Sequence, residues 1–242
     1  MNFTVIGKYG PFPPEGGACS CYLLEFSDKK IVLDMGAGSF SRLMHFVDVF
    51  DIDAIFLSHL HFDHMSDIPV FGYAVNAINK KLGQDKKIKL FTPKEPSNIF
   101  KLFSREAFDI ETINENLKVK LGKAEITFLK MTHPFPSYAI KVDDGEKIFA
   151  YSGDTSLNDK LAGFIKGASV ALLDANFKHK DKPQNTVHMT ITEAAMVAKQ
   201  ANVKKLILTH QSAFNSSREV LNEAIKVFLK SQTAQEMKSI VI

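Results

Sequence analysis

The sequence predicts an α/β fold in which two mixed β-sheets pack face to face, with helices on their outer faces. Two observations lead to this prediction. Apolar segments of strand length dominate the first two thirds of the chain, with a few helical patterns between them. In the last third, helical and strand patterns alternate regularly, as in α/β proteins. No repeat or long linker divides the chain, so we expect residues 1–242 to form a single domain.

Each expected element follows from its own local pattern. Strands are expected at 1–7, 19–26, 30–34, 54–58 and 88–91, and helices at 40–50, 68–81 and 97–107. Four further strands follow at 117–121, 126–131, 138–142 and 147–152, the last two joined by the turn Asp143-Asp144-Gly145-Glu146. The alternating part contains helices at 158–166, 190–201 and 217–229 and strands at 170–174 and 205–209. Capping boxes mark the starts of its last two helices, Thr190 with Glu193 and Ser216 with Glu219.

Composition excludes several protein classes. Apolar residues make up 45% of the chain, and 30 basic against 27 acidic residues give a net charge of +3, which does not by itself argue for a nucleic-acid partner. No apolar run approaches the roughly 18 residues of a membrane span, and the N-terminus has the pattern of a strand, so we expect a cytoplasmic protein. The two cysteines, Cys19 and Cys21, are expected to be reduced and buried.

A cluster of metal-binding residue types points to the chemistry. Three histidines and one aspartate fall within His59-Leu60-His61-Phe62-Asp63-His64, directly after the expected strand 54–58. Side chains at this spacing would scatter around a helix, so we expect a loop in which they converge. Imidazole and carboxylate ligands without thiolate suit zinc, with manganese and iron as alternatives.

Three more candidate ligands occur where other strands end. His133, Asp154 and His210 each follow the carboxyl end of an apolar strand. Loop residues at such ends gather into one site in layered folds. Together with the histidine cluster, these residues are enough for a site that holds two metal ions.

This set of residues, in this order along the chain, resembles the metallo-β-lactamase superfamily. The resemblance covers essentially the whole chain and implies a four-layer αβ/βα sandwich with two divalent metal ions at one edge. Carried onto this sequence, one ion is held by His59, His61 and His133, and the other by Asp63, His64 and His210. Asp154 bridges the two ions.

A narrower resemblance concerns the C-terminal half. The segments Leu172-Leu173-Asp174-Ala175-Asn176-Phe177 and His188-Met189-Thr190 are similar to those of ribonuclease Z and related phosphodiesterases. There an acidic residue pairs with a catalytic histidine, and the matching positions are Asp174 and His188. The Pro-x-Lys-x-Arg-Asn loop and the long tRNA-gripping arm of ribonuclease Z have no counterpart here. The resemblance therefore implies phosphodiesterase chemistry more strongly than tRNA processing.

The expected function is hydrolysis of a phosphodiester, either an RNA end or a small or cyclic phosphodiester. A water shared by the two ions would be deprotonated to hydroxide and attack phosphorus. Asp63 would orient it, and His188, held by Asp174, would stabilise the charge of the pentacoordinate phosphorus or protonate the leaving oxygen. A carboxylic ester, thioester or lactone hydrolase is the alternative, and a non-catalytic RNA-binding protein is a third possibility. The resemblance also implies a homodimer.

Overall fold

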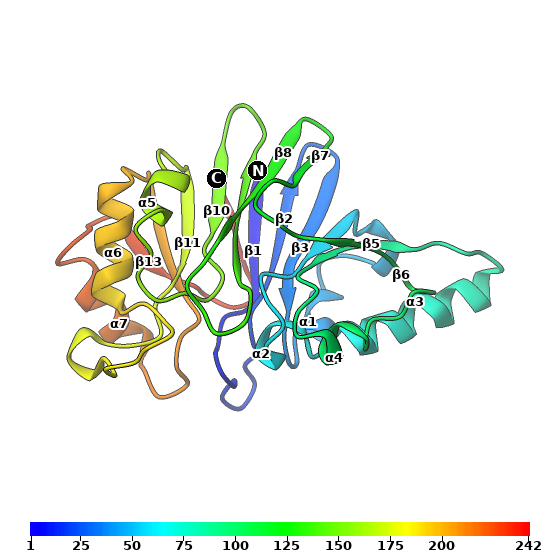
Figure 1. The fold of residues 1–242 in the computed structure, drawn as a ribbon, viewed down its shortest axis with the longest axis horizontal. Helices are drawn as coiled ribbons and strands as arrows, with labels where there is room; N and C mark the ends of the chain where they lie inside the picture. Colours follow the sequence, from blue (N-terminus) through cyan, green and yellow to red (C-terminus); the bar gives the residue numbers. More distant parts are fainter.

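The structure, a computed structural model that describes residues 1–242, has the two sheets that the sequence predicts (Figure 1). The first sheet contains, from edge to edge, β14 (Lys238–Val241), β1 (Asn2–Gly7), β2 (Cys21–Phe26), β3 (Lys29–Met35), β4 (Ala54–Phe56), β5 (Ile88–Thr92) and β6 (Phe108–Thr112). The second contains β13 (Ser231–Thr233), β12 (Leu206–Thr209), β11 (Val170–Asp174), β10 (Ile148–Tyr151), β9 (Tyr138–Asp143), β8 (Ala124–Lys130) and β7 (Lys118–Leu121). Both sheets mix parallel and antiparallel neighbours, which confirms the predicted fold class.

Helices cover the two outer faces (Figure 1). The first sheet is covered by α1 (Phe40–Leu43), α2 (Phe62–Met65), α3 (Ile68–Leu82) and α4 (Ser97–Phe100), with a 3-10 turn at Val49–Asp51. The second sheet is covered by α5 (Leu161–Phe164), α6 (Ile191–Gln200) and α7 (Ser217–Ala224), and a 3-10 turn at His179–Asp181 precedes α6. None of these helices combines the length and apolar character that crossing a bilayer requires.

The core has three apolar layers, one between the sheets and one under each helical layer. Strand β11 shows how the sequence produces them. Val170 and Leu172 point into the layer between the sheets, while Ala171 and Leu173 point into the layer under the helices. Because both faces of this central strand are buried, its sequence is a continuous apolar run and not an alternating one. Phe3 and Phe149, whose ring centroids are 4.9 Å apart, join the two sheets across the middle layer.

Three short strands were missing from the sequence-based prediction, namely β6, β13 and β14. All three lie at sheet edges. Edge strands have one face or side in solvent, so Ser231–Thr233 and Lys238–Val241 carry polar residues and produce little apolar signal. The C-terminal strand β14 pairs with β1, which places the two chain ends side by side.

Four predicted helices are shorter than expected. The segments expected at 40–50, 97–107, 158–166 and 217–229 form helices only at Phe40–Leu43, Ser97–Phe100, Leu161–Phe164 and Ser217–Ala224. Their apolar residues are still buried: Val47 and Phe103, for example, pack into the layer beneath the helices from the irregular segments that follow α1 and α4. Tertiary packing thus satisfies the amphipathic pattern without a continuous helix. The predicted hairpin between β9 and β10 is confirmed, with Asp143 opposite Ile148.

Candidate metal centre and active site

The carboxyl ends of several strands meet at one edge of the molecule. Strands β3 and β4 are parallel neighbours, and so are β10, β11 and β12. Strand β8 runs in the direction of β10, because both are antiparallel to β9. The residues at or just after these ends include His59, His133, Asp154, Asp174 and His210. The structure therefore brings together side chains that lie up to 151 positions apart along the chain (210 minus 59).

The histidine cluster is not wholly a loop, contrary to the prediction. His59 and Leu60 follow β4, His61 has an extended backbone, and α2 then begins at Phe62. Because α2 is a single turn, Asp63 and His64 do not spread around a helix circumference. Both reach the same cluster, with His64 Nε2 3.6 Å from Asp63 Oδ2.

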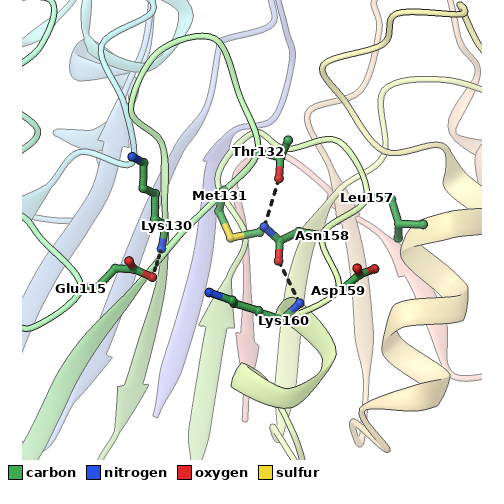
Figure 2. A pocket seen from close by; sticks show the side chains of 8 residues that line it. All are labelled: Glu115, Lys130, Met131, Thr132, Leu157, Asn158, Asp159 and Lys160. Atoms are coloured by element: carbon green, nitrogen blue, oxygen red, sulfur yellow. Dashed lines mark hydrogen bonds between the residues drawn. The ribbon is translucent and has the colours of Figure 1, made fainter.

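Two hollows lie near these loops, and only one of them contains predicted site residues. That hollow, of about 370 Å³, is lined by His61, Asp63, Asp154, His188 and His210, together with Pro11 and Phe62. The other, of about 380 Å³, is lined by Lys130, Thr132, Asn158 and Lys160 among others (Figure 2). Its side chains carry charges of both signs and no imidazole. The first hollow is therefore the candidate active site.

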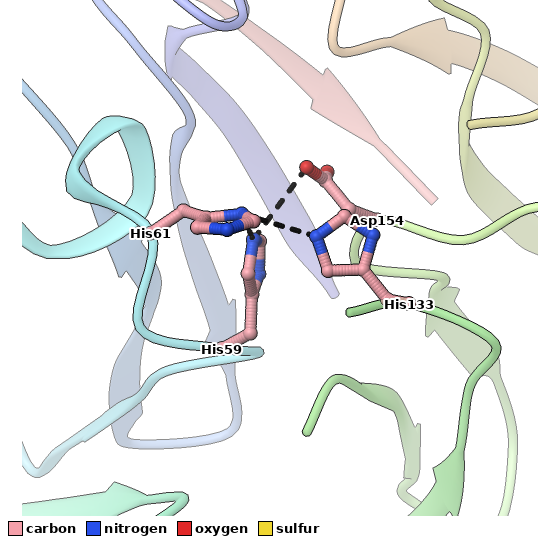
Figure 3. A group of neighbouring side chains, drawn as sticks. All are labelled: His59, His61, His133 and Asp154. Atoms are coloured by element: carbon pink, nitrogen blue, oxygen red, sulfur yellow. Dashed lines mark hydrogen bonds and ion pairs between the residues drawn. The ribbon is translucent and has the colours of Figure 1, made fainter. Parts of the chain in front are cut away.

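A first group of ligand atoms is formed by His59, His61, His133 and Asp154 (Figure 3). His61 Nδ1 lies 3.0 Å from His59 Nε2 and 3.0 Å from His133 Nε2, and His59 Nε2 lies 3.6 Å from Asp154 Oδ2. Burial, with repulsion from His133, lowers the pKa of His61 to about 4, and burial also lowers the pKa values of His59 and His133. The three rings are thus neutral at pH 7, with nitrogen lone pairs available to a cation.

A second group is formed by Asp63, His64, Asp154 and His210. His210 Nε2 lies 3.0 Å from Asp63 Oδ2 and 3.2 Å from Asp154 Oδ2, and His64 Nε2 lies 3.3 Å from Asp154 Oδ2. Burial opposes charge on His64, but the surrounding carboxylates outweigh it and raise the pKa of His64 well above its usual value. This group therefore favours positive charge at its centre.

The donor atoms of both groups fit metal ions. His64 Nε2 and Asp154 Oδ1 are buried and have no hydrogen-bond partner, a costly situation that coordination would relieve. The donors are imidazole nitrogens and carboxylate oxygens, which suit first-row divalent ions. The two groups share Asp154 and otherwise have the same members as the two ligand sets that the resemblance implies.

The pair Asp174 and His188 borders the second group. His188 Nδ1 lies 2.9 Å from Asp174 Oδ2 and 3.8 Å from Asp154 Oδ2, and its ring stacks on that of His210 with centroids 4.8 Å apart. Burial lowers the pKa of His188, but the carboxylate of Asp174 outweighs it and raises that pKa to about 9. His188 is therefore a cation at neutral pH, held by Asp174 at the edge of the candidate active site.

Two residues that position the site were not singled out from the sequence. Asp34, fully buried at the end of β3, accepts hydrogen bonds from His64 Nδ1, Ser58 Oγ and Tyr151 Oη. The one sequence feature that could have indicated it is a carboxylate directly after the apolar run Ile31-Val32-Leu33. Asn176 donates from Nδ2 to the carbonyl oxygens of Gly10 and His210. No pattern in the sequence distinguishes it from a loop asparagine.

His210 itself has an unusual backbone. Its φ is 51°, in the left-handed region that residues with a Cβ rarely occupy. Such strain is found where the surrounding structure holds a residue in place for function. Here the bonds from Asn176 and the backbone bond from Gln211 N to Lys8 O hold it.

Comparison with known proteins connects this geometry to a family. A family model described as the beta-lactamase superfamily domain matches residues 30–211. The protein YhfI of Bacillus subtilis, described as a probable metallo-hydrolase, is 31% identical over 232 residues, which is 94% of each chain. A ribonuclease Z of Methanopyrus kandleri is 22% identical over 259 residues, covering 92% of this chain and 91% of the relative.

Solved structures agree with the sequence comparisons. The crystal structure of YhfI from Bacillus subtilis superimposes with a TM-score of 0.93 at 29% identity, covering 99% of this chain and 98% of that one. The short form of human tRNase Z gives a TM-score of 0.78 at 20% identity, covering 100% of this chain and 99% of that one. At that identity, the second likeness concerns the fold alone.

Proposed function

The chain belongs to the beta-lactamase superfamily and is a metallo-hydrolase, and we propose that it is a phosphodiesterase that uses two divalent metal ions. The observation that carries the proposal is the ion pair of His188 and Asp174 beside the second ligand group. A phosphodiester brings a negative charge to the site and gains more as it is attacked, so a cationic imidazole at this position favours such a substrate.

The proposed ligands are the members of the two groups, with Asp154 common to both. His59, His61 and His133 would hold one ion, and the other would be held by Asp63, His64 and His210. Zinc is the expected metal, with manganese or iron as alternatives. When bound, two such ions neutralise charge on the phosphoryl oxygens and lower the pKa of water towards neutrality.

The protein groups then have separate tasks. The carboxylate of Asp63, whose side chain is 10% exposed, faces the hollow and orients the attacking water through its free oxygen. His188, which also lines the hollow, donates a proton to the leaving oxygen. Asp174 makes no direct contact with substrate in this scheme. Its carboxylate holds the ring of His188 and keeps it protonated.

The substrate is proposed to be a small or cyclic phosphodiester or an RNA end. A sequence relative named ribonuclease Z supports an RNA substrate. The region between His64 and His133 forms α3, β5, α4, β6, β7 and β8, which are ordinary elements of the two sheets and their cover. Since this region contains no long arm, a small phosphodiester is favoured over precursor tRNA.

One experiment tests this proposal. The metal content of the purified protein is measured first, and the protein is then assayed with bis-p-nitrophenyl phosphate, 2′,3′- and 3′,5′-cyclic nucleotides, precursor tRNA and a lactone. The Asp63→Ala variant serves as the inactive control. Turnover of a phosphodiester with about two metal ions per chain is the expected result. Turnover of the lactone alone would show that the site is a carboxylic ester hydrolase.

A further inference from the structure

Three of the four exposed aromatic side chains lie on segments that line the candidate active site or contact its lining loops. The chain has 20 phenylalanines and five tyrosines, and nearly all are buried or half-buried. Only four have large exposed fractions: Phe12 at 48%, Phe62 at 63%, Phe214 at 84%, and Tyr73 on α3 at 75%. We call Phe12, Phe62 and Phe214 the aromatic rim. Exposing a phenylalanine ring to water is unfavourable, so three such rings at one site require an explanation.

Two residues of the lining connect the rim to the hollow. Phe62 lines it directly, between His61 and Asp63 in sequence. Pro11 lines it too, and its neighbour in the sequence, Phe12, packs edge-on against Phe214 with ring centroids 5.7 Å apart. An edge-on pair leaves a ring face open, which agrees with the 84% exposure of Phe214.

The loops that carry this pair are attached to the site. Gly10 lies so close to His210 that a Cβ on it would be 1.9 Å from Nε2 of that ring. The carbonyl oxygen of Gly10 accepts a hydrogen bond from Asn176 Nδ2, and Asn215 Nδ2 donates to the carbonyl oxygen of Asn176. The loops that carry Phe12 and Phe214 are therefore attached to the second ligand group through Asn176 and His210.

We propose that the aromatic rim, through Phe12 and Phe214, is a stacking platform for a nucleobase of the phosphodiester substrate. This inference rests on the proposed phosphodiesterase function and narrows its substrate class to nucleotides. Aromatic faces bind planar bases by stacking, an interaction worth about 1–3 kcal/mol per base. A binding site for an acyl chain could be lined by aliphatic side chains as well as by aromatic ones. The exposed positions of the rim all carry phenylalanine, which favours a planar base.

The platform is expected to bind any nucleobase and not to distinguish one base from another. The polar side chains of the Phe214 loop are already engaged: Gln211 Oε1 accepts from Lys8 Nζ, Ser212 Oγ accepts from Phe214 N, and Asn215 donates to Asn176. Each of these side chains is therefore held by a hydrogen bond within the protein. The protein should therefore distinguish nucleotides from base-free sugar phosphates more strongly than it distinguishes one base from another.

The test compares a ligand with and without its base. Adenosine 5′-monophosphate and ribose 5-phosphate are titrated into the zinc-loaded protein, for wild type and for Phe214→Ala, Phe214→Leu and Phe12→Ala/Phe214→Ala. Tyr73→Ala, an exposed aromatic residue on α3 that belongs neither to the aromatic rim nor to the lining of the hollow, is the matched control. We expect Phe214→Ala to weaken adenosine monophosphate binding about tenfold and to leave ribose 5-phosphate binding unchanged. Phe214→Leu should recover only part of the loss, and Tyr73→Ala should have no effect.

A direct readout separates stacking from indirect effects. With ¹³C-labelled phenylalanine, the ring signals that disappear in Phe214→Ala should shift on addition of adenosine monophosphate and not on addition of ribose 5-phosphate. Equal weakening of both ligands, unchanged affinities, or ring signals that do not move would overturn the proposal. So would variants that alter only the oligomeric state, since the rim would then be a self-association surface. Base-dependent binding without turnover of any phosphodiester would instead refute the proposed function and leave the platform standing.

Discussion

The imidazole of His64 and the carboxylate of Asp34 form a hydrogen bond of 2.8 Å at the base of the candidate metal centre, and both side chains are fully buried. The bond occupies His64 Nδ1 and directs Nε2 towards the second ligand group. Asp34 also accepts from the backbone N–H and hydroxyl of Ser58 and from the hydroxyl of Tyr151. A single carboxylate thus joins β3, β10 and the start of the histidine cluster.

Replacing this carboxylate should weaken metal binding. Asp34→Asn keeps the size of the side chain, and asparagine tolerates the left-handed backbone at this position, where φ is 57°. The amide is a poorer acceptor for His64 Nδ1, and partners of this kind are worth about 10–100-fold in metal affinity. Competition with a chelator measures the affinity, and Asp109→Asn, an exposed position on β6, is the control. Wild-type affinity in Asp34→Asn would show that the bond does not orient the ligand.

The proposed division of tasks within the site predicts different effects for two substitutions. Asp63→Ala removes a proposed ligand, so both metal content and activity should fall, with activity lost completely. His188→Ala removes a proton donor that lies outside the two ligand groups, so the rate should fall by about 10²–10⁴ while metal content stays at the wild-type value. Elemental analysis of the two purified variants, alongside their rates, decides the matter. Equal metal loss in both would contradict the separate roles.

Much of the site could be predicted from the sequence because its chemistry is carried by rare residue types at strand ends. Each of His133, Asp154 and His210 follows an apolar run, and the chain has only eight histidines. The histidine cluster His59–His64 also indicates which of the other histidines and aspartates are candidate ligands. The structure then brings these residues together in two groups of candidate ligands that share Asp154, with the pair Asp174 and His188 beside the second group.

Asp34 and Phe214 show what the sequence could not reveal. Asp34 is an aspartate at the end of a strand, like many that cap turns, and only the fold shows its contact with His64, 30 residues away. Phe214 is one of 20 phenylalanines, most of which are buried or half-buried, and nothing in its local sequence distinguishes it from them. Exposure depends on tertiary packing, which local patterns do not encode. The shortened helices have the same cause, since buried turns satisfy the same apolar spacing as a longer helix.

The capping box of α6 predicts a measurable contribution to stability. The hydroxyl of buried Thr190 accepts from Glu193 N at 3.1 Å, and the carboxylate of Glu193 accepts from Thr190 N at 2.9 Å. Thr190→Ala leaves a buried N–H at the helix start without this partner, so the free energy of unfolding should fall by about 1–2 kcal/mol. Urea denaturation measures it. Ser216→Ala removes a cap of α7 at an exposed contact and should cost less. A larger loss in Ser216→Ala would mean that burial does not govern the value of these caps.

The same substitution, glycine to alanine, is expected to have opposite effects at Gly10 and at Gly163. In Gly10→Ala the added methyl group would lie 1.9 Å from His210 Nε2, so either the ring or the loop must move and the second ligand group must distort. In Gly163→Ala the methyl group meets nothing within 4 Å and lies in α5, where alanine is favoured over glycine by about 0.4–1 kcal/mol. We therefore expect Gly10→Ala to lose metal and at least about 99% of the activity, because misplacement by 1 Å alone can cost about 10²-fold. Gly163→Ala should be fully active and slightly more resistant to urea. Full metal content and wild-type rate in Gly10→Ala would show that His210 is not confined by this loop.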